Sequence, residues 1–460
     1  MSLPVTPSTG EDSAGARPCL LLLASKMGYQ TRGFAEAAAR LGLEVVIGSD
    51  RCHQLDDPWS DGAVPLHFEQ PETAARQLVQ AVRGRHVRGI LALGDRQTAT
   101  AAHTARLLGL RYNSPESVEN CRSKLRQRRV LRAAGLPVPE FSSFHVSEAV
   151  ESVLHRVEFP CVVKPLRLSA SQGGIRVNDS AEFCAAVHRI AKLLASAEIQ
   201  VTREPDLDRL LVESYIPGAE VALEGLLDRG QLRVLALFDK PDPLEGPYFE
   251  ETIYTTPSRL SAEVQQSISD CAQQTVRALG LTEGPLHAEF RVPGAGCTCL
   301  PRGTKGSPRQ YNDGGPWVLE ASPRPIGGLC SRALRFGPQR IFLEELLVRQ
   351  AIGLPNASLE RESPAAGVMM IPVPSSGVLE EVSGVDQASA VPGVEELHIT
   401  TRLHDFIAAW PEGSSYLGFI FARADSPQQV EAALRRAHAT LHFHIAPRLP
   451  VEHPVTSRSG

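Results

Sequence analysis

Short apolar runs alternate with amphipathic stretches along the N-terminal quarter of the chain. The runs have the length of buried strands, and the stretches between them have the 3.6-residue periodicity of helices. Such alternation predicts an open, largely parallel sheet with helices on its faces. The expected strands and helices follow one another at residues 19–25, 31–42, 43–50, 72–84, 88–95 and 97–109.

The rest of the chain has a different order of predicted strands and helices. After residue 155, a strand, a glycine-rich loop and a second strand are followed by a helix and a third strand, which predicts a small α+β subdomain. Longer strands then surround one long helix, and the C-terminal part adds further strands and a helix. These elements are expected at residues 180–197, 209–216, 221–228, 232–240, 261–281, 284–292, 315–325, 367–374, 416–423 and 426–441.

The patterns together predict a multidomain chain of α/β and α+β parts. Residues 1–18 are polar and rich in Ser, Thr, Gly and Pro, so we expect a disordered tail there. An N-terminal α/β domain is expected over 19–118 and a central domain over 119–355, with the small subdomain at about 155–212. A C-terminal α+β segment would cover 356–460.

Composition and charge narrow the class of protein. Hydrophobic residues make up 42% of the chain, charged residues 22%, and the net charge is −5, so neither nucleic acid nor a membrane is an expected partner. The apolar run 19–25 is too short to span a bilayer and lacks a basic flank, so we interpret it as a buried strand. Nine scattered cysteines favour a reduced, cytoplasmic setting. Cys297 and Cys299 lack a second pair, so no metal site is expected there.

Residues 162–177 place Lys164 at the end of an apolar run, followed by a loop of small residues and a second apolar run. The stretch is not a P-loop, because there the lysine follows the glycines and leads into a helix. Two interpretations stay open: a plain hairpin turn, or a loop whose backbone amides approach an anion while the lysine supplies charge. The loop residues concerned are Ser169, Ser171, Gly173 and Gly174.

A basic helical region lies between Ser114, a predicted N-cap followed by proline, and Gly135, which ends it. A solvated helix face is one interpretation of its charges. The other is that one residue, Lys124, turns toward a bound phosphate. The six basic residues are Arg122, Lys124, Arg126, Arg128, Arg129 and Arg132.

Two carboxylates flank a predicted turn between strands. Glu213 ends one strand and Glu220 begins the next. A carboxylate in such a position can accept hydrogen bonds from a ribose diol, and the backbone near residues 214–216 can pair with adenine. Exposed carboxylates at strand edges would give the same pattern.

Glu289 and Glu320 lie on two strands that are expected to be buried. Two such carboxylates would repel each other unless a cation lies between them. Mg²⁺ completed by phosphate oxygens would supply that cation. Structural ion pairs with Arg291 or Arg324 would also neutralise the charge.

Taken together, these pieces resemble the ATP-grasp superfamily, and within it the L-amino acid ligases that form dipeptides. The resemblance extends from the first predicted strand nearly to the C-terminus. It implies an ATP-grasp fold, in which two α+β subdomains hold ATP beneath a mobile loop, preceded by a parallel-sheet domain. The stretches that carry it are, in order, KLRQRRVLRAAGLPVPEF, PCVVKPLRLSASQGGIRV, LVESYIPGAEVALEG, GPYFEETIY, GPLHAEFRV and LEASPRPIGGLCSRALRF.

The resemblance also implies roles for individual residues. The ATP-binding residues would be Lys124, Lys164, Ser169, Ser171, Gly173, Gly174, Glu213, Ser214, Tyr215, Ile216 and Glu220. The metal ligands, for two Mg²⁺ ions or Mn²⁺ in their place, would be Glu289, Glu320 and Ser322. The substrates would contact Glu251, Tyr254, Gly327 and Gly328, and the catalytic residues would be Arg324 and Lys164. Ser322 stands where the family often has asparagine, so one metal contact would differ.

The implied activity is that of a carboxylate–amine ligase. It would consume ATP, form an amide or peptide bond through an acylphosphate, and release ADP and phosphate. Its partners would be small carboxylates and amines such as amino acids, and the resemblance is compatible with a homodimer. Two alternatives stay open: another ATP-grasp enzyme, such as a carboxylase or a purine-pathway ligase, and an ATP-binding regulatory protein without catalysis.

Overall fold

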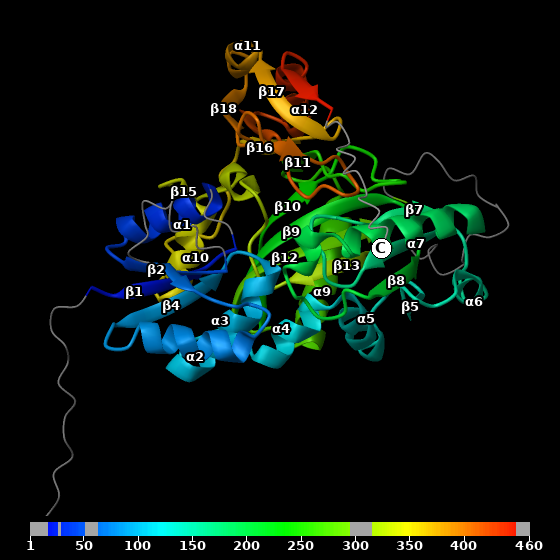
Figure 1. Cartoon of the computed structure of the whole chain (residues 1–460). Coiled ribbons are helices and arrows are strands. Elements are labelled where there is room, and N and C mark those ends of the chain that lie inside the picture. Colours follow the sequence, from blue (N-terminus) through cyan, green and yellow to red (C-terminus); the bar gives the residue numbers. More distant parts are fainter. Residues whose placement is uncertain (1–16, 26–28, 51–62, 295–314, 448–460) are drawn as a thin grey trace, which may run out of the picture.

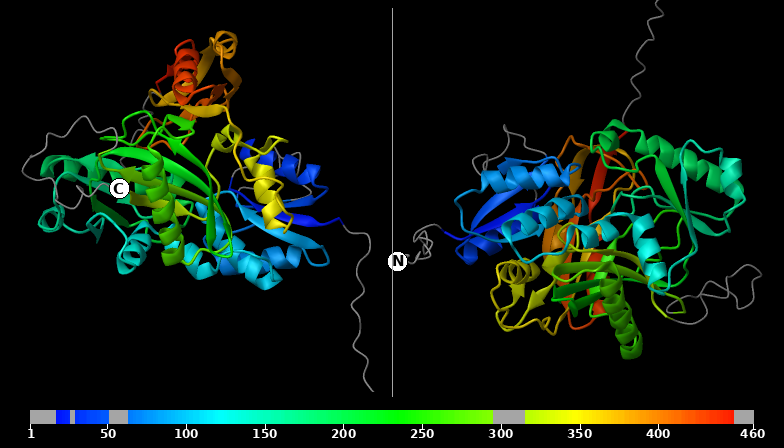
Figure 2. Two further views of the ribbon diagram at one scale, coloured as in Figure 1. Left: turned by 180° about the vertical axis from the view of Figure 1, so that it is seen from behind. Right: turned by 90° about the horizontal axis from the view of Figure 1, so that it is seen from below.

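The computed structural model describes residues 17–25, 29–50, 63–294 and 315–447. Figure 1 shows the N-terminal domain and the small subdomain on opposite sides of a central, strand-rich body, with the C-terminal part above it. Figure 2 shows the same arrangement from behind and from below. Nearly all of the expected disordered tail, together with Cys297 and Cys299, lies outside the described residues.

The N-terminal domain is a parallel sheet in the strand order β3-β2-β1-β4. Its elements are β1 (Cys19–Leu23), α1 (Tyr29–Arg40), β2 (Glu44–Ser49), β3 (Ala63–Pro65), α2 (Pro71–Ala81), β4 (Val87–Ala92) and α3 (Asp95–Leu108). Leu21 packs in the core under α2 and α3, whereas Leu22 packs in the core under α1. Both faces of the sheet are therefore covered, which explains why the first strand is an uninterrupted apolar run.

The basic region before the small subdomain forms two helices, α4 (Pro115–Arg122) and α5 (Lys124–Ala133). Ser114 caps α4 as predicted, by accepting a hydrogen bond from a backbone amide of the first turn (3.1 Å). Ser123 interrupts the region and caps α5 in the same way (3.4 Å). This second start places Lys124 in the first turn of a helix.

The small subdomain is an antiparallel sheet in the order β5-β8-β6-β7, with α7 packed against it. Its elements are β5 (Phe141–His145), α6 (Val150–Leu154), β6 (Cys161–Pro165), β7 (Ile175–Val177), α7 (Ser180–Leu194), α8 (Ala197–Gln200) and β8 (Arg209–Ser214). Phe183, Val187 and Ile190 recur at helical spacing on α7 and fill the core of this subdomain. The glycine-rich loop, residues 166–174, joins β6 to β7.

The central body is an eight-stranded sheet in the order β13-β12-β9-β10-β11-β16-β20-β18. Its first five strands are β9 (Ala219–Asp228), β10 (Gln231–Asp239), β11 (Ile253–Thr256), β12 (Gly284–Val292) and β13 (Trp317–Ser322). On β9, Leu223 packs in the core with α9 (Ala262–Leu279), and Ala222 packs in the core with α10 (Leu343–Ala351). Helices thus cover both faces of the sheet, and its strands are consequently buried along most of their length. A 3-10 helix (Cys330–Ala333) and a short pair, β14 (Arg335–Phe336) and β15 (Ile341–Phe342), precede α10.

The C-terminal part continues the same sheet. The strands β16 (Ala365–Ile371), β18 (Val394–Ile399) and β20 (Gly418–Ala424) extend it beyond β11. A second sheet carries β17 (Gly377–Ser383), β19 (Phe406–Ile407) and β21 (His442–Ala446), and the helices are α11 (Val385–Ser389) and α12 (Pro427–His438). The domain boundary expected after residue 355 therefore falls between strands of one continuous sheet.

The alternating patterns predicted most of these elements and their types, and the predicted α/β and α+β fold class is confirmed. The basic region, expected to be helical between Ser114 and Gly135, consists of two helices, α4 and α5. Among the described residues, no helix combines the length and the apolarity that crossing a bilayer requires.

Candidate active site

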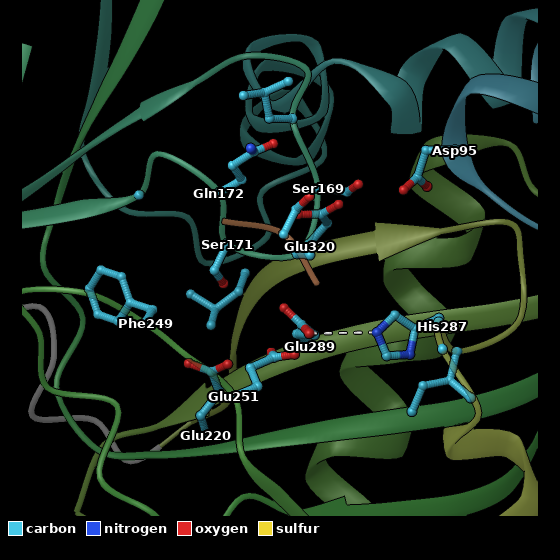
Figure 3. Close-up of a pocket in the computed structure, with 18 of the residues that line it drawn as sticks. Asp95, Ser169, Ser171, Gln172, Glu220, Phe249, Glu251, His287, Glu289 and Glu320 are labelled. Carbon is cyan, nitrogen blue, oxygen red and sulfur yellow. Dashed lines mark ion pairs between the residues drawn. The ribbon is translucent and has the colours of Figure 1, made fainter. Parts of the chain in front are cut away.

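A cavity of about 510 Å³ lies where the N-terminal domain, the small subdomain, the central sheet and the C-terminal part meet. Figure 3 labels side chains from the N-terminal domain, the small subdomain and the central body that converge on it. Of the residues predicted for a site, only Ser322 and Gly173 do not line it. Those that do are Lys124, Lys164, Ser169, Ser171, Gly174, Glu213, Ser214, Tyr215, Ile216, Glu220, Glu251, Tyr254, Glu289, Glu320, Arg324, Gly327 and Gly328.

Lys164 and Glu213 line one part of the cavity, and Arg128 is buried behind that carboxylate; we call these three residues the cationic end. Lys164 Nζ lies 2.5 Å from Glu213 Oε2, and Arg128 Nε lies 2.5 Å from Glu213 Oε1. Burial alone would raise the pKa of the Glu213 carboxyl, but the two cations outweigh it and lower the pKa to about 2. One carboxylate is shared by two cations, so this end carries an excess of positive charge.

Lys124 links the glycine-rich loop to the central sheet. Its Nζ donates a hydrogen bond to the backbone oxygen of Leu168 (2.6 Å) and lies 3.4 Å from Glu320 Oε2. Arg128 follows one helical turn later on α5, so both side chains extend from the same face of that helix. Of the six basic residues in the region, these two reach the cavity or its wall.

The segment after β8 forms another part of the wall. The guanidinium of Arg176 lies over the ring of Tyr215, 4.0 Å from its centroid. Ile216 is buried beside Trp317 of β13. Arg291 Nη1 donates to the hydroxyl of Tyr215 (3.4 Å), which ties this segment to the central sheet.

Glu289 on β12 and Glu320 on β13 are register partners across the two strands. Directly opposed residues of an antiparallel pair have Cβ atoms about 5 Å apart. Both side chains line the cavity, as Figure 3 shows. Neither carboxylate pairs with Arg291 or Arg324 within 4.0 Å; the neighbouring cations are instead Lys240 and His287 at Glu289, and Lys124 at Glu320.

The carboxylate cluster consists of Glu220, Glu251 and Glu289, each of which offers an oxygen within 4.8 Å of the others. Lys240, at the end of β10, lies among them. Its Nζ is 2.7 Å from Glu220 and 3.0 Å from Glu289, and it also forms an ion pair with Glu251. Arg291 Nε adds a further contact to Glu220, at 2.9 Å.

These contacts shift the pKa values of the carboxyls in the cluster in opposite directions. Burial raises the pKa of the Glu251 carboxyl to about 7; Lys240 opposes this, while Glu289 and Glu220 add to it. Burial would also raise the pKa of Glu289, but Lys240 and His287 outweigh it and hold that pKa well below its ordinary value. Tyr254 donates a hydrogen bond from its hydroxyl to Glu251 Oε2 (2.7 Å). Lys240 and Arg291 together offset two of the three carboxylates, and the third, Glu251, is partly protonated at neutral pH.

Arg324 lies between the central sheet and the N-terminal domain. Its Nε donates to Asp95 Oδ1 (2.9 Å), at the start of α3. Burial would lower the pKa of Arg324, but the Asp95 carboxylate outweighs it and raises the pKa. Ser322 also hydrogen-bonds to Asp95. The predicted metal ligand Ser322 is thus buried and engaged by Asp95 rather than exposed in the cavity.

His287 and Glu224 form a buried pair beside the cluster. Nδ1 of His287 lies 2.5 Å from Glu224 Oε1, and Nε2 lies 3.5 Å from Glu289 Oε1. Burial would lower the pKa of His287, but Glu224 outweighs it and raises the pKa to about 9. His287 is therefore a cation at neutral pH, and it turns one N–H toward Glu289.

The far wall of the cavity comes from the C-terminal part. Thr400, Ser414, Ser415, Tyr416 and Phe419 line it opposite the glycine pair that follows Arg324. A Cβ atom at Gly327 would meet nothing within 4 Å, whereas one at Gly328, which has φ +61°, would touch the ring of Phe419 at 3.0 Å. Gly327 thus leaves room in the cavity.

Several residues of the site were not predicted. Asp95, Arg128, Lys240 and His287 all contact predicted residues, and the C-terminal wall was absent from the prediction. Lys240 had a signal in the sequence, because it ends an apolar strand just as Lys164 does. Arg128 also had one, because it lies four residues after Lys124 in a helix. Asp95 likewise ends an apolar run, residues 88–95, whereas the C-terminal residues had no signal, since only the fold brings them to the cavity.

Comparison with known proteins agrees with this architecture. A protein-family model described as "ATP-grasp N-terminal domain" matches residues 35–110, and one described as "ATP-grasp domain" matches residues 157–301. A third, "L-amino acid ligase C-terminal domain 2", matches residues 369–446. The three matches follow the order of the parts in the structure.

Individual relatives point the same way. The structure of L-amino acid ligase from Bacillus licheniformis has a TM-score of 0.75 and 26% identity, covering 94% of this chain and 99% of that chain. An uncharacterized protein of Sinorhizobium fredii is 26% identical, over 93% of this chain and 83% of its own length. D-alanine--D-alanine ligase of Aromatoleum aromaticum is 28% identical, over 62% of this chain and 85% of its own length. The chain is an ATP-grasp protein that resembles the L-amino acid ligases.

Proposed function

We propose that this protein is an ATP-dependent carboxylate–amine ligase, with ADP and phosphate as products. The observation that carries the proposal is one continuous cavity with a cationic end and a carboxylate cluster. An anionic nucleotide can contact the lysines of such a cavity while its carboxylates bind a cation. The resemblance to L-amino acid ligases supports amino acids as the two substrates.

Lys164 and Lys124 would bind phosphate oxygens of ATP, beneath the glycine-rich loop. The segment Ser214–Ile216 would hold adenine, and Glu220 would contact the ribose. Arg324, which Asp95 orients, would counter charge on the transferred phosphoryl group. Glu251 and Tyr254 would bind the amino group of a substrate.

The carboxylates also fit a metal ion. Glu289 and Glu320 face each other across two strands and offer only oxygen donors, the ligands that Mg²⁺ prefers. Bound Mg²⁺ would neutralise charge on the phosphate oxygens of ATP. Ser322 contributes less to such a site than predicted, because Asp95 engages it.

The proposed reaction has two steps. An oxygen of the substrate carboxylate attacks the γ-phosphorus of ATP, and the bond from that phosphorus to ADP breaks. The nitrogen of the amine then attacks the acylphosphate carbonyl, phosphate leaves, and the nitrogen loses a proton. The glycine-rich loop would exclude water, which otherwise hydrolyses the acylphosphate.

A product assay tests the proposal. The purified protein is incubated with ATP, Mg²⁺ and pairs of L-amino acids, each amino acid also being tested alone, while ADP, AMP and the amide are measured. We expect ADP and the amide to appear together, only when both substrates are present. Release of AMP and pyrophosphate would rule out the mechanism, and ADP release that depends on bicarbonate would indicate a carboxylase.

One observation favours a second candidate, an ATP-binding protein without ligase activity. Lys240 lies among the three carboxylates of the cluster and competes there with any metal ion. This candidate predicts that calorimetry detects ATP binding while no amino acid pair stimulates ADP release.

A further inference from the structure

The glycine-rich loop is held by the C-terminal part of the chain as well as by its own subdomain. The holding segment is residues 410–416, between β19 and β20, which we call the latch segment. Three hydrogen bonds join it to the loop. They run from the amide of Gly173 to the Pro411 oxygen (3.0 Å), from Gln172 Nε2 to the Glu412 oxygen (2.6 Å) and from Trp410 Nε1 to the Ala170 oxygen (3.3 Å).

The loop adopts a conformation that needs such support. Ala170 and Ser171 have φ values of 55° and 54°, in the left-handed region that residues with a Cβ seldom occupy. Backbone of this kind persists where the surrounding structure over-determines it. Of the three hydrogen bonds to the latch segment, one involves Ala170 itself and two involve Gln172 and Gly173, which follow Ser171 directly.

An ion pair reinforces the contact. Arg189 on α7 forms a bidentate pair with the Glu412 carboxylate, with Nη2 2.9 Å from Oε2. The hydrogen bond from Arg189 lowers the pKa of Glu412, so the pair is charged at neutral pH. The latch segment is thereby tied to the helix of the small subdomain as well as to the loop.

The other half of the latch segment faces the substrate side of the cavity. Ser414, Ser415 and Tyr416 line it, and the ring of Tyr416 lies 5.0 Å from that of Trp410. Between the halves, Gly413 packs so closely that a Cβ atom there would lie 2.0 Å from the Ala408 oxygen. The turn between the two halves is therefore tight, and it leaves no room for a side chain at Gly413.

We propose that the latch segment positions the glycine-rich loop over the cavity and couples its closure to the substrate side. Arg189 and Glu412 are positioning residues, which act on the loop and touch no reacting atom. The coupling to substrate rests on the proposed function; the hold on the loop does not. The chemical consequence is that loosening the latch admits water to the acylphosphate.

Hydrogen exchange of the peptide around residues 166–176 tests the hold on the loop directly, in the full chain with Mg²⁺ and a non-hydrolysable ATP analogue. Arg189→Gln should speed exchange of this peptide about two- to fivefold, the effect of losing a partly exposed ion pair. Arg189→Lys should restore part of the protection, because it keeps the charge but not the fork. Gly413→Ala, which displaces the turn, should speed exchange more.

Glu396→Gln is the matched control. It breaks the contacts of Arg332 Nη2 with both Glu396 carboxylate oxygens (3.1 and 2.9 Å) and the contact of His398 Nε2 with Glu396 Oε2 (3.0 Å), none of which involves the loop. Exchange of the loop peptide should stay unchanged there. Unchanged exchange in both Arg189→Gln and Gly413→Ala, with melting temperatures near that of the parent, would overturn the proposal.

Activity supplies the second readout. With a substrate pair that yields amide, Arg189→Gln should release more ADP per amide formed than the parent, and Glu396→Gln should not. An unchanged ratio together with faster exchange would overturn the coupling to substrate. If no pair yields amide in the parent, the proposed ligase function fails, and the exchange experiment still decides whether the latch holds the loop.

Discussion

Two buried ionic groups contribute to the walls of the cavity, and they are built in opposite ways. At the cationic end, Glu213 is shared by Arg128 and Lys164. In the carboxylate cluster, Lys240 is shared by three carboxylates. Burial raises the cost of unbalanced charge, so each end favours a ligand of the opposite sign.

With these two ionic groups, a single cavity can orient a ligand that carries both phosphate and a metal ion. Anionic phosphate suits the cationic end, and Mg²⁺ or an ammonium group suits the carboxylate cluster. Orientation would then follow from charge before any shape is matched. Substitutions that make the charges of the two groups more alike should therefore weaken the orientation of the ligand.

Among these substitutions, Lys240→Met should have the largest effect on stability. Three carboxylates would remain without their shared cation, and removing one partner of a buried ion pair costs about 3–5 kcal/mol. The melting temperature in thermal denaturation should fall. Added Mg²⁺ should raise the melting temperature of the variant more than that of the parent, because the metal can replace the ammonium group. Lys192→Met, at an exposed lysine of α7, is the control. Equal effects of Mg²⁺ on variant and parent would contradict a cation site here.

Glu320→Gln should nearly abolish turnover while leaving the fold intact. The amide keeps the shape of the carboxylate but lacks the charge that a hard cation favours, so we expect a loss of about 100- to 1,000-fold in kcat. Steady-state ADP release and a melting curve measure the two properties. Glu381→Gln, on the exposed side of β17, should behave like the parent. Wild-type turnover in Glu320→Gln would remove this residue from the site.

Lys164→Ala should weaken nucleotide binding without abolishing it. A charge-assisted contact to phosphate contributes about 1.5–3 kcal/mol, which corresponds to roughly 10- to 150-fold in Kd. Titration calorimetry with ATP and Mg²⁺ measures the change, with Lys192→Ala as the matched lysine outside the cavity. ATP affinity equal to that of the parent would refute the assigned role.

His287 should give the smallest effect, visible as a pH dependence. Its pKa of about 9 lies above the value of about 6.5 in an unfolded chain. The pair with Glu224 therefore stabilises the fold fully below pH 6.5, and this contribution is lost as the pH rises through 9. We expect a loss of about 2 kcal/mol between pH 7 and pH 9, measured by urea denaturation. His287→Gln should lack this slope, and an identical slope in both proteins would contradict the assignment.

The sequence predicted much of the fold because burial leaves a periodic trace. The strand 19–25 is apolar throughout because β1 is covered on both faces, and the helix 180–197 shows one apolar stripe because α7 packs with one face. The same logic found Lys164, Glu289 and Glu320, since a charge inside an apolar strand is conspicuous.

The rest could not be predicted because it depends on contacts between distant parts of the chain. Asp95 meets Arg324 only when the N-terminal sheet docks on the central sheet. Tyr416 reaches the cavity only because β16 and β20 join the same sheet as β11. The family resemblance assigned Ser322 a metal contact, but its hydrogen bond to Asp95 arises only where the N-terminal domain meets the central sheet.

The continuous eight-stranded sheet also has a consequence for synthesis on the ribosome. β11 pairs with β16 through partners such as Ile253 and Met369, so its outer edge stays open until the later strand has been made. At a translation rate of about 5–20 residues per second, the growing chain carries this open edge for roughly 5–20 seconds. An unpaired edge of buried, apolar strands readily joins other chains. The nascent chain therefore exposes a strand edge to other chains during this interval, and the pairing of β11 with β16 closes it.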